Sequence, residues 1–354
     1  MSGYYTLDKI KKIKDLDGKK PSMFLISSNR SAGKTTAVLK EFIECFLQDE
    51  TQFAIIYRNQ YEMSDAHNIF ADILQREYSN YSMETKACAK GLFYQIILKD
   101  EKESHLCGYA VGLFAVDKMK KYSPLFYNVN RALFDEYQLE NGRYMKNEPQ
   151  KLMSLIISIA RGGGSQSRNI DLYMLSNNIS ILNPYYISLG ITQRLTDNVH
   201  FLRGHGWVLE QGYNSSADKA VSENNIVRAF SESNSAFTEY MTSKNSYLIN
   251  MSAFIKKQTG KSRYLCTIEY GDKKIGVREF YETGEIHCND KVDPSAFYTF
   301  VFTPGNHSQN TVMLKRSSFI FKTLENAFNN AFLTFENVEI KNIIFLLLGI
   351  DMYG

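Results

Sequence analysis

The stretch Met23–Thr36 reads MFLISSNRSAGKTT and joins an apolar run, a loop of small residues and the start of a helix. Its first four residues are apolar, as in a strand that is buried on both faces of a parallel sheet. A good helical pattern continues from Ala37 to Phe46. This order of elements places backbone N–H groups at a helix N-terminus, where they can surround an anion.

Within this stretch, Ser28-x-x-x-x-Gly33-Lys34-Thr35 matches a phosphate-binding loop except at its first position, where the motif has Gly. Ser28 can form the first turn if its φ is negative. Lys34 would neutralise the β and γ phosphates of ATP, and the Thr35 hydroxyl would ligate Mg²⁺. The alternative is an ordinary helix N-terminus. The residues that we expect to contact the nucleotide are Ser28, Asn29, Arg30, Ser31, Ala32, Gly33, Lys34, Thr35 and Thr36.

A second buried strand, Ala132–Phe134, ends in the acidic pair Asp135-Glu136. In a nucleotide hydrolase, Asp135 would hold Mg²⁺ through a water. Glu136 would orient and deprotonate the attacking water, because a hydrolase needs a base beside its nucleophile. The alternative for Glu136 is a solvated strand end.

A third strand ends in polar residues at Leu175-Ser176-Asn177. Motor ATPases often carry a polar residue on the strand between the phosphate-loop strand and the acidic strand, where it senses the γ-phosphate and couples hydrolysis to movement. Ser176 and Asn177 are therefore candidates for coupling, and a turn-forming Ser-Asn pair is the equal alternative.

Two basic elements flank these strands. Arg161 follows a predicted helix over 148–160 and precedes Gly162–Gly164. It is either a cation at the helix C-terminus ahead of a glycine cap, which the residues alone favour, or an arginine finger that reaches a neighbouring subunit's γ-phosphate. A basic loop just before the acidic strand would face DNA phosphates or a neighbour's nucleotide, or else form a solvated surface. It contains Lys118, Lys120 and Lys121.

Composition adds few constraints. The net charge of +3 does not by itself indicate a nucleic-acid-binding protein. The 5 cysteines are scattered, so reduced thiols are expected rather than disulfides or a zinc site. The N-terminus lacks the apolar segment of a signal peptide, and the longest apolar run, Ile343–Ile350, is far short of the roughly 20 residues that a membrane span needs. We therefore expect a protein that is made and used inside a cell.

The pattern along the 354 residues predicts two domains. Strands alternate with helices over 1–212, which indicates an α/β sheet that is mostly parallel. Residues 213–246 are rich in Ser, Asn, Glu and Ala and read as a linker with room for a short helix. From 247 to 354 the pattern is α+β: antiparallel strands over 263–270, 274–281 and 284–288, then helices over 317–332 and 341–348.

These motifs together resemble a known family. The stretch Leu175–Tyr186 (LSNNISILNPYY), with Arg30–Thr35 and Phe134–Tyr137, is similar to the genome-packaging ATPases of small tailed bacteriophages with protein-primed linear genomes. The likeness covers nearly the whole chain, closely at the motifs and loosely elsewhere. It implies a P-loop ATPase domain of the additional-strand, catalytic-glutamate (ASCE) type, related to large terminases, with a smaller RNase H-like C-terminal domain.

The resemblance also implies roles for the motif residues. Lys34 and Thr35 become the phosphate and Mg²⁺ residues, Asp135 the acid on the metal side and Glu136 the catalytic base. Arg161 lies where the family has its trans-acting arginine, and a basic residue of 118–121 would also act in trans. The family forms a pentameric ring at the procapsid portal in the host cytoplasm and drives double-stranded DNA inward; a structural RNA is a further candidate partner.

The C-terminal domain resembles the degenerate RNase H-like domain of the same family. Larger relatives cut DNA there with clustered carboxylates that hold two metal ions. Here the strand over 263–270 offers only Glu269 as an interior acid, and Glu325, Glu336 and Glu339 lie near helix ends. We therefore expect docking to portal, DNA or RNA. The alternatives are a terminase with an active nuclease, a nucleotide-gated assembly factor without turnover, and a kinase-like phosphotransferase.

Overall fold

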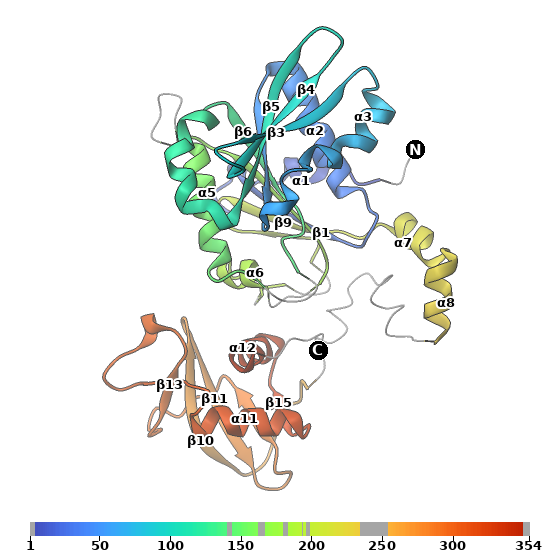
Figure 1. Cartoon of the computed structure of the whole chain (residues 1–354). Coiled ribbons are helices and arrows are strands. Elements are labelled where there is room, and N and C mark those ends of the chain that lie inside the picture. Colours follow the sequence, from blue (N-terminus) through green and yellow to red (C-terminus); the bar gives the residue numbers. More distant parts are fainter. Residues whose placement is uncertain are drawn as a thin grey trace. The chain divides into compact units, whose positions relative to one another are not determined.

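A computed structural model describes residues 4–139, 144–161, 167–179, 183–192, 194–195, 199–233 and 254–349 of the chain (Figure 1). Its contacts divide the chain into two compact units. The N-terminal unit combines Met1–Ile179 with Asn198–Ser246, and the C-terminal unit combines Ser180–Asp197 with Tyr247–Gly354. Each unit thus joins two separate segments, whereas the predicted domains are contiguous in sequence.

The N-terminal unit is built on a nine-stranded sheet in the order β3-β4-β5-β2-β6-β7-β1-β9-β8. The five central pairings among β5, β2, β6, β7, β1 and β9 are parallel, and β3, β4 and β8 pair antiparallel at the two edges. The strands are β1 (Met23–Ser28), β2 (Gln52–Tyr57), β3 (Ser82–Cys88), β4 (Phe93–Lys99), β5 (Ser104–Gly112), β6 (Val129–Phe134), β7 (Asp171–Asn177), β8 (Phe201–Arg203) and β9 (Trp207–Gln211).

Helices cover this sheet because the central strands are apolar on both faces. Helix α2 places Phe42 against Phe53 and Tyr173, and Tyr173 stacks on Phe24 of β1. The helices of the unit are α1 (Asp8–Lys12), α2 (Lys34–Asp49), α3 (Ala71–Glu77), α4 (Val116–Met119), α5 (Glu148–Ala160), α7 (Ser215–Ser222) and α8 (Asn225–Ser233), with short 3-10 turns η1 (Gln60–Glu62), η2 (Ala66–Phe70), η3 (Leu113–Ala115) and η4 (Lys120–Phe126).

The basic segment that we predicted as a loop is helical. Lys118 lies in α4, and Lys120 and Lys121 lie in η4. Helical spacing explains the difference, because Val116, Met119, Ser123 and Phe126 all turn inward and are buried while the lysines between them stay exposed.

The C-terminal unit has a six-stranded sheet in the order β14-β13-β10-β11-β12-β15. The predicted antiparallel pairs β10–β11 and β11–β12 are present, and β13, β14 and β15 add parallel pairings. Helices α11 and α12 bury Ile320, Leu324, Ile340 and Ile344 in its core. The elements are α6 (Pro184–Ser188), β10 (Ser262–Tyr270), β11 (Lys273–Phe280), β12 (Ile286–Asn289), β13 (Thr299–Val301), η5 (Pro304–Asn306), β14 (Val312–Met313), α11 (Phe319–Asn329), β15 (Leu333–Phe335) and α12 (Val338–Leu348).

The α/β fold class is thus confirmed, with a large parallel sheet followed by a smaller α+β unit. Across the part of the chain that the structure describes, no helix is both long and apolar enough to span a membrane.

Candidate active site

The loop between β1 and α2 has the backbone of an anion-binding turn. Ser31 and Gly33 adopt left-handed φ values of 58° and 89°. Ser28 is not among the described residues with positive φ, so a serine can form this turn where the motif has Gly. Turns of this kind direct successive N–H groups to one side, toward the N-terminus of α2.

Lys34 is buried at the start of α2. Its Nζ donates to the carbonyl oxygens of Ser28 and Asn29 at 3.3 and 3.1 Å, to Ser28 Oγ at 3.1 Å and to Asn177 Oδ1 at 3.4 Å. Burial lowers the pKa of Lys34 from 10.5 to about 8, with nearby Asp135 opposing the shift. An ammonium with so little water around it favours an anionic ligand that restores its charge.

The two residues that we predicted to hold Mg²⁺, Thr35 and Asp135, contact each other. Thr35 Oγ1 donates a hydrogen bond of 2.7 Å to Asp135 Oδ2, across 100 positions of sequence. Burial raises the pKa of the Asp135 carboxyl, while the hydrogen bonds from Thr35 and the Glu136 N–H and the charge of Lys34 oppose that rise. A hydroxyl and a carboxylate are hard oxygen donors, and Mg²⁺ is usually held by one or two such groups together with water and substrate phosphates. The residues therefore fit Mg²⁺.

Glu136 has an unusual backbone for a residue with a side chain. Its φ is 54°, in the left-handed region, which costs energy unless the surroundings hold it. Asp135 Oδ1 accepts its N–H at 2.8 Å, and Arg58 Nη1 donates to its carbonyl oxygen at 2.6 Å. The chain thus turns sharply just after β6, which carries the Glu136 side chain beyond the strand.

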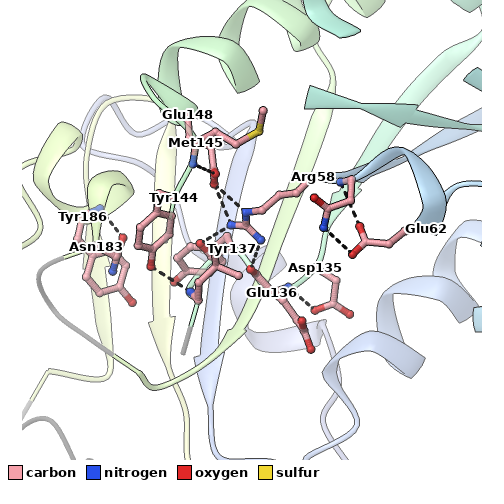
Figure 2. A network of polar contacts seen from close by, with 12 residues as sticks. Arg58, Glu62, Asp135, Glu136, Tyr137, Tyr144, Met145, Glu148, Asn183 and Tyr186 are labelled. Atoms are coloured by element: carbon pink, nitrogen blue, oxygen red, sulfur yellow. Dashed lines mark hydrogen bonds and ion pairs between the residues drawn. The ribbon is translucent and has the colours of Figure 1, made fainter. Parts of the chain in front are cut away.

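Arg58, directly after β2, ties this turn to helix α5 (Figure 2). Its Nη2 donates to the Tyr137 carbonyl at 2.8 Å, and its Nε and Nη2 reach Glu148 Oε1 at 3.0 and 2.8 Å. Both side chains are nearly or fully buried. Sequence reasoning missed Arg58 and Glu148. The only signal was that Arg58 follows a buried strand directly, as Asp135 does.

Strand β7 lies between β1 and β6, as the sequence led us to expect of the coupling strand. Its terminal Asn177 pairs in register with Ser28 and offers its side-chain oxygen to Lys34, as described above. The Ser176 hydroxyl donates to the Asn177 carbonyl at 2.6 Å. Asn177 therefore touches the lysine of the loop, and Ser176 lies one residue behind it.

A cavity of about 230 Å³ opens beside these strand ends. Thr35, Asp135 and Glu136 line it together with Arg58 and Glu62. The carboxyl ends of β2 and β6 form its wall, which agrees with the rule that ligands of open α/β sheets bind at the carboxyl ends of the strands.

Arg161 lies at the opposite end of the strands from Asp135, where β6 begins. Helix α5 begins at Glu148, beside Arg58, and its far end is held where β6 begins: Arg168 donates to the carbonyl of Ile159 at 2.7 Å and to Asn130 Oδ1 at 3.1 Å. Arg161 follows this end in an extended conformation and is exposed. Its predicted glycine cap, 162–164, lies outside the described residues.

The three lysines of 118–121 lie at the same end of the strands as Arg161, because η4 ends just before β6 begins and both α4 and η4 contact α5. Lys120 Nζ is 3.3 Å from Asp117 Oδ1, and Lys121 Nζ lies 5.0 Å from the centre of the Tyr122 ring. Lys118, Lys120 and Lys121 are all exposed, so this end carries a basic surface.

In the C-terminal unit, the predicted interior acid is paired. Glu269 Oε1 lies 2.6 Å from Lys274 Nζ, and Glu339 lies 2.7 Å from Lys273. Within the described residues, no group of three or more His, Cys, Asp or Glu side chains is placed to hold a metal ion.

Comparison with known proteins gives a consistent result. The DNA packaging protein of Bacillus phage phi29 is 23% identical over 325 residues, 90% of each chain, and that of Bacillus phage B103 is 24% identical over 323 residues, 89% of this chain and 92% of the relative. A chain of the bacteriophage Phi-29 viral genome packaging motor assembly superposes with a TM-score of 0.66 at 25% identity, covering 98% of this chain and 99% of that chain.

A chain of the Phi-28 gp11 DNA packaging motor superposes with a TM-score of 0.63 at 19% identity and covers 99% of both chains. The family model described as Podovirus DNA encapsidation protein (Gp16) matches residues 10–351. This chain therefore belongs to the Podovirus DNA encapsidation protein (Gp16) family.

Proposed function

We propose that this chain is the ATP-hydrolysing subunit of a ring motor that drives double-stranded viral DNA into a procapsid. The observation that carries the proposal is the 2.7 Å contact between Thr35 and Asp135, which brings the loop and the acidic strand of a DNA encapsidation family member to one point. The sheet order with β7 between β1 and β6 supports the same assignment.

The chemistry follows from the strand ends. The loop N–H groups and Lys34 bind the β and γ phosphates, and Lys34 exchanges its contacts with Ser28, Asn29 and Asn177 for phosphate oxygens. Mg²⁺, held by Thr35 and through water by Asp135, would neutralise phosphate charge. Glu136 accepts a proton from a water as its oxygen attacks the γ phosphorus, the bond to the β–γ bridging oxygen breaks, and ADP and phosphate leave.

Arg161 would complete the site of a neighbouring subunit. It lies where β6 begins, whereas Asp135 follows the end of β6. The six residues of this strand span about 20 Å. An arginine side chain cannot cover that distance to its own loop. An exposed arginine beside basic helices is suited to stabilise transition-state charge on the nucleotide of the next subunit.

Mixed rings test this shared site. Arg161→Ala protein keeps Glu136, and Glu136→Gln protein keeps Arg161, so one kind of mixed interface contains both groups. We expect the mixture to hydrolyse ATP faster than either variant alone. A mixture no more active than its components would contradict a shared site.

Membership in the DNA encapsidation family supports a proposal for the partners. We propose a pentameric ring on the portal of the procapsid in the host cytoplasm, with the C-terminal unit docking to portal, DNA or a structural RNA. The ion pair between Glu269 and Lys274 supports docking over cutting, because the one interior acid of β10 is already paired with a cation.

The test of the main proposal is the ATP hydrolysis rate with and without double-stranded DNA, with Glu136→Gln as control. We expect turnover that DNA stimulates and that the variant lacks. Nucleotide binding without turnover, in the presence of procapsids as well, would instead establish a nucleotide-gated assembly factor. Metal-dependent cutting of plasmid DNA by the full chain would favour a nuclease-competent terminase.

A further inference from the structure

A pair of asparagines connects the phosphate-binding loop to helix α7. Asn29 Nδ2 donates to the Asn214 carbonyl at 2.9 Å, and the Asn214 N–H donates to Asn29 Oδ1 at 2.8 Å. The Asn29 side chain therefore satisfies both backbone groups of one residue. Because Asn29 is 7% exposed, water competes little for these contacts.

The contacts extend the sheet beyond the strands. The β1–β9 pairing ends at Ser27 and Gln211, and Gly212 N–H then donates to the Ser27 carbonyl at 2.8 Å. Asn29 supplies the next two hydrogen bonds from its side chain, where the loop has turned away from the strand direction. The end of β1 and the first residue of the loop are thus hydrogen-bonded to the segment 212–214.

Each asparagine also contacts a further group. The Asn29 carbonyl accepts from Lys34 Nζ at 3.1 Å. The Asn214 side chain accepts from Ala217 N–H at 2.9 Å and so caps the N-terminus of α7. A continuous chain of contacts therefore leads from the phosphate-binding ammonium to the first turn of α7.

We propose that Asn29 and Asn214 are a coupling pair that transmits nucleotide binding at the loop to helix α7. The inference rests on the proposed nucleotide site. When phosphates take the Lys34 ammonium, the Asn29 carbonyl loses this donor and keeps the weaker contact from Ser28 Oγ at 3.3 Å, so its peptide can reorient and shift the side chain that holds Asn214. Helix α7 is followed in sequence by α8 and then by the residues that lead to the C-terminal unit, so it is a suitable receiver.

Amide hydrogen exchange of the full-length protein tests the pair. Exchange in peptides covering Ser215–Ser222 is measured without nucleotide, with Mg²⁺–ADP and with Mg²⁺–ATPγS, and nucleotide affinity is measured in parallel. We expect saturating ATPγS to change the exchange rate in the first turn of α7 about fivefold, the scale of gaining or losing one helix cap. The Asn29→Ala variant, measured at the nucleotide concentration that its own affinity shows to be saturating, should show less than about a twofold change.

Two variants separate coupling from simple helix stability. Asn224→Ala removes the contacts of Asn224 Oδ1 with the first turn of α8 and touches nothing in the loop, so it should leave the α7 response intact. Asn214→Ala removes the α7 cap but keeps the backbone contacts with Asn29, so it should raise α7 exchange in every state.

The possible failures are distinguishable. Failure of the wild type to bind nucleotide would overturn the nucleotide site itself. Wild type that binds ATPγS without any change in α7, or Asn29→Ala that binds it and retains the full change, would overturn the coupling pair and leave the site standing.

Discussion

The two sheets of this chain treat their polar side chains in opposite ways. In the N-terminal unit, residues at the ends of β1, β6 and β7 converge: Lys34 donates to Asn177, and Thr35 beside it donates to Asp135. In the C-terminal unit, charges are paired one by one, as in Glu269–Lys274 and Arg263–Glu279. Strand direction does not explain this difference, because β11 alone runs against the other five strands of the second sheet. The difference lies in the residues: the first sheet brings an amide and an acid to the carboxyl ends of its central strands, where ligands of open α/β sheets bind, whereas Glu269 and Lys274 are directly opposite each other on neighbouring strands of the second sheet and pair there.

The largest expected effect is on turnover. Glu136→Gln should lower the ATP hydrolysis rate by about 10²–10⁴-fold, because the amide cannot accept the proton of the attacking water. Glu269→Gln, the same change at the paired acid of the second sheet, should leave the rate unchanged. Steady-state phosphate release measures both. Equal losses in the two variants would show that the carboxylates are not functionally distinct.

The buried and exposed ion pairs of the two units should differ in stability. Arg58→Met leaves Glu148 buried without its cation, and we expect a loss of about 3–5 kcal/mol in the free energy of unfolding. Arg263→Met breaks a pair whose arginine is 62% exposed, and should cost less than about 1 kcal/mol. Urea unfolding compares them. A small loss for Arg58→Met would mean that Glu148 finds another partner or a proton.

Each unit also buries a lysine, and only one of them faces the proposed nucleotide. Burial lowers the pKa of both Lys34 and Lys341 to about 8. Between pH 8 and 10.5 the unfolded chain holds protons that the native lysines have lost, so wild-type stability should rise with pH in this window.

Replacing either lysine by Met should raise stability at pH 7 by about 2 kcal/mol, with the gain shrinking as the pH rises through that window. Saturating Mg²⁺–ADP should reduce the difference in the free energy of unfolding between Lys34→Met and the wild type. It should not change the difference between Lys341→Met and the wild type. Urea unfolding at pH 7 and 10 measures this. A gain at Lys34 that persists at high pH would show that removal of charge is not its cause.

The smallest expected effect distinguishes the units by acid sensitivity. His287 in β12 is 2% exposed, contacts Thr334 Oγ1 at 2.9 Å, and has its pKa lowered by burial from 6.5 to about 4. As the pH falls from 6.5 toward 4, His287 is protonated in the unfolded chain but stays neutral in the native state, so the C-terminal unit loses stability.

We expect a loss of about 1–2 kcal/mol between pH 6.5 and 5. Hydrogen-exchange protection of β12 should reveal it, with β1 amides as the internal reference. His287→Asn should remove most of the pH dependence. An equal loss of protection in β1, or an unchanged profile in the variant, would contradict the assignment to His287.

Local sequence pattern identified the elements whose signals are complete within a few residues. Helix α5 begins and ends at the predicted residues, and the strands that end at Ser28, at Phe134 just before Asp135, and at Asn177 were found from their apolar runs. Six of the described strands were missed. Strand β3 has a largely exposed, polar pattern, and β8, β13, β14 and β15 are only 2 or 3 residues long. The sixth is β9. The lysine segment was read as a loop because its buried positions are spread over several short helices.

The residues of the candidate site could thus be named from the chain, but not their contacts. The local motifs predicted Lys34 and Thr35, which begin a helix, and Asp135 and Glu136, which come directly after a strand. The order of the strands, by contrast, depends on pairings between distant segments, which neighbouring residues do not encode. Only folding places β7 between β1 and β6, closes Arg58 on Glu148 across 90 positions, and separates Arg161 from its own loop by the length of a strand.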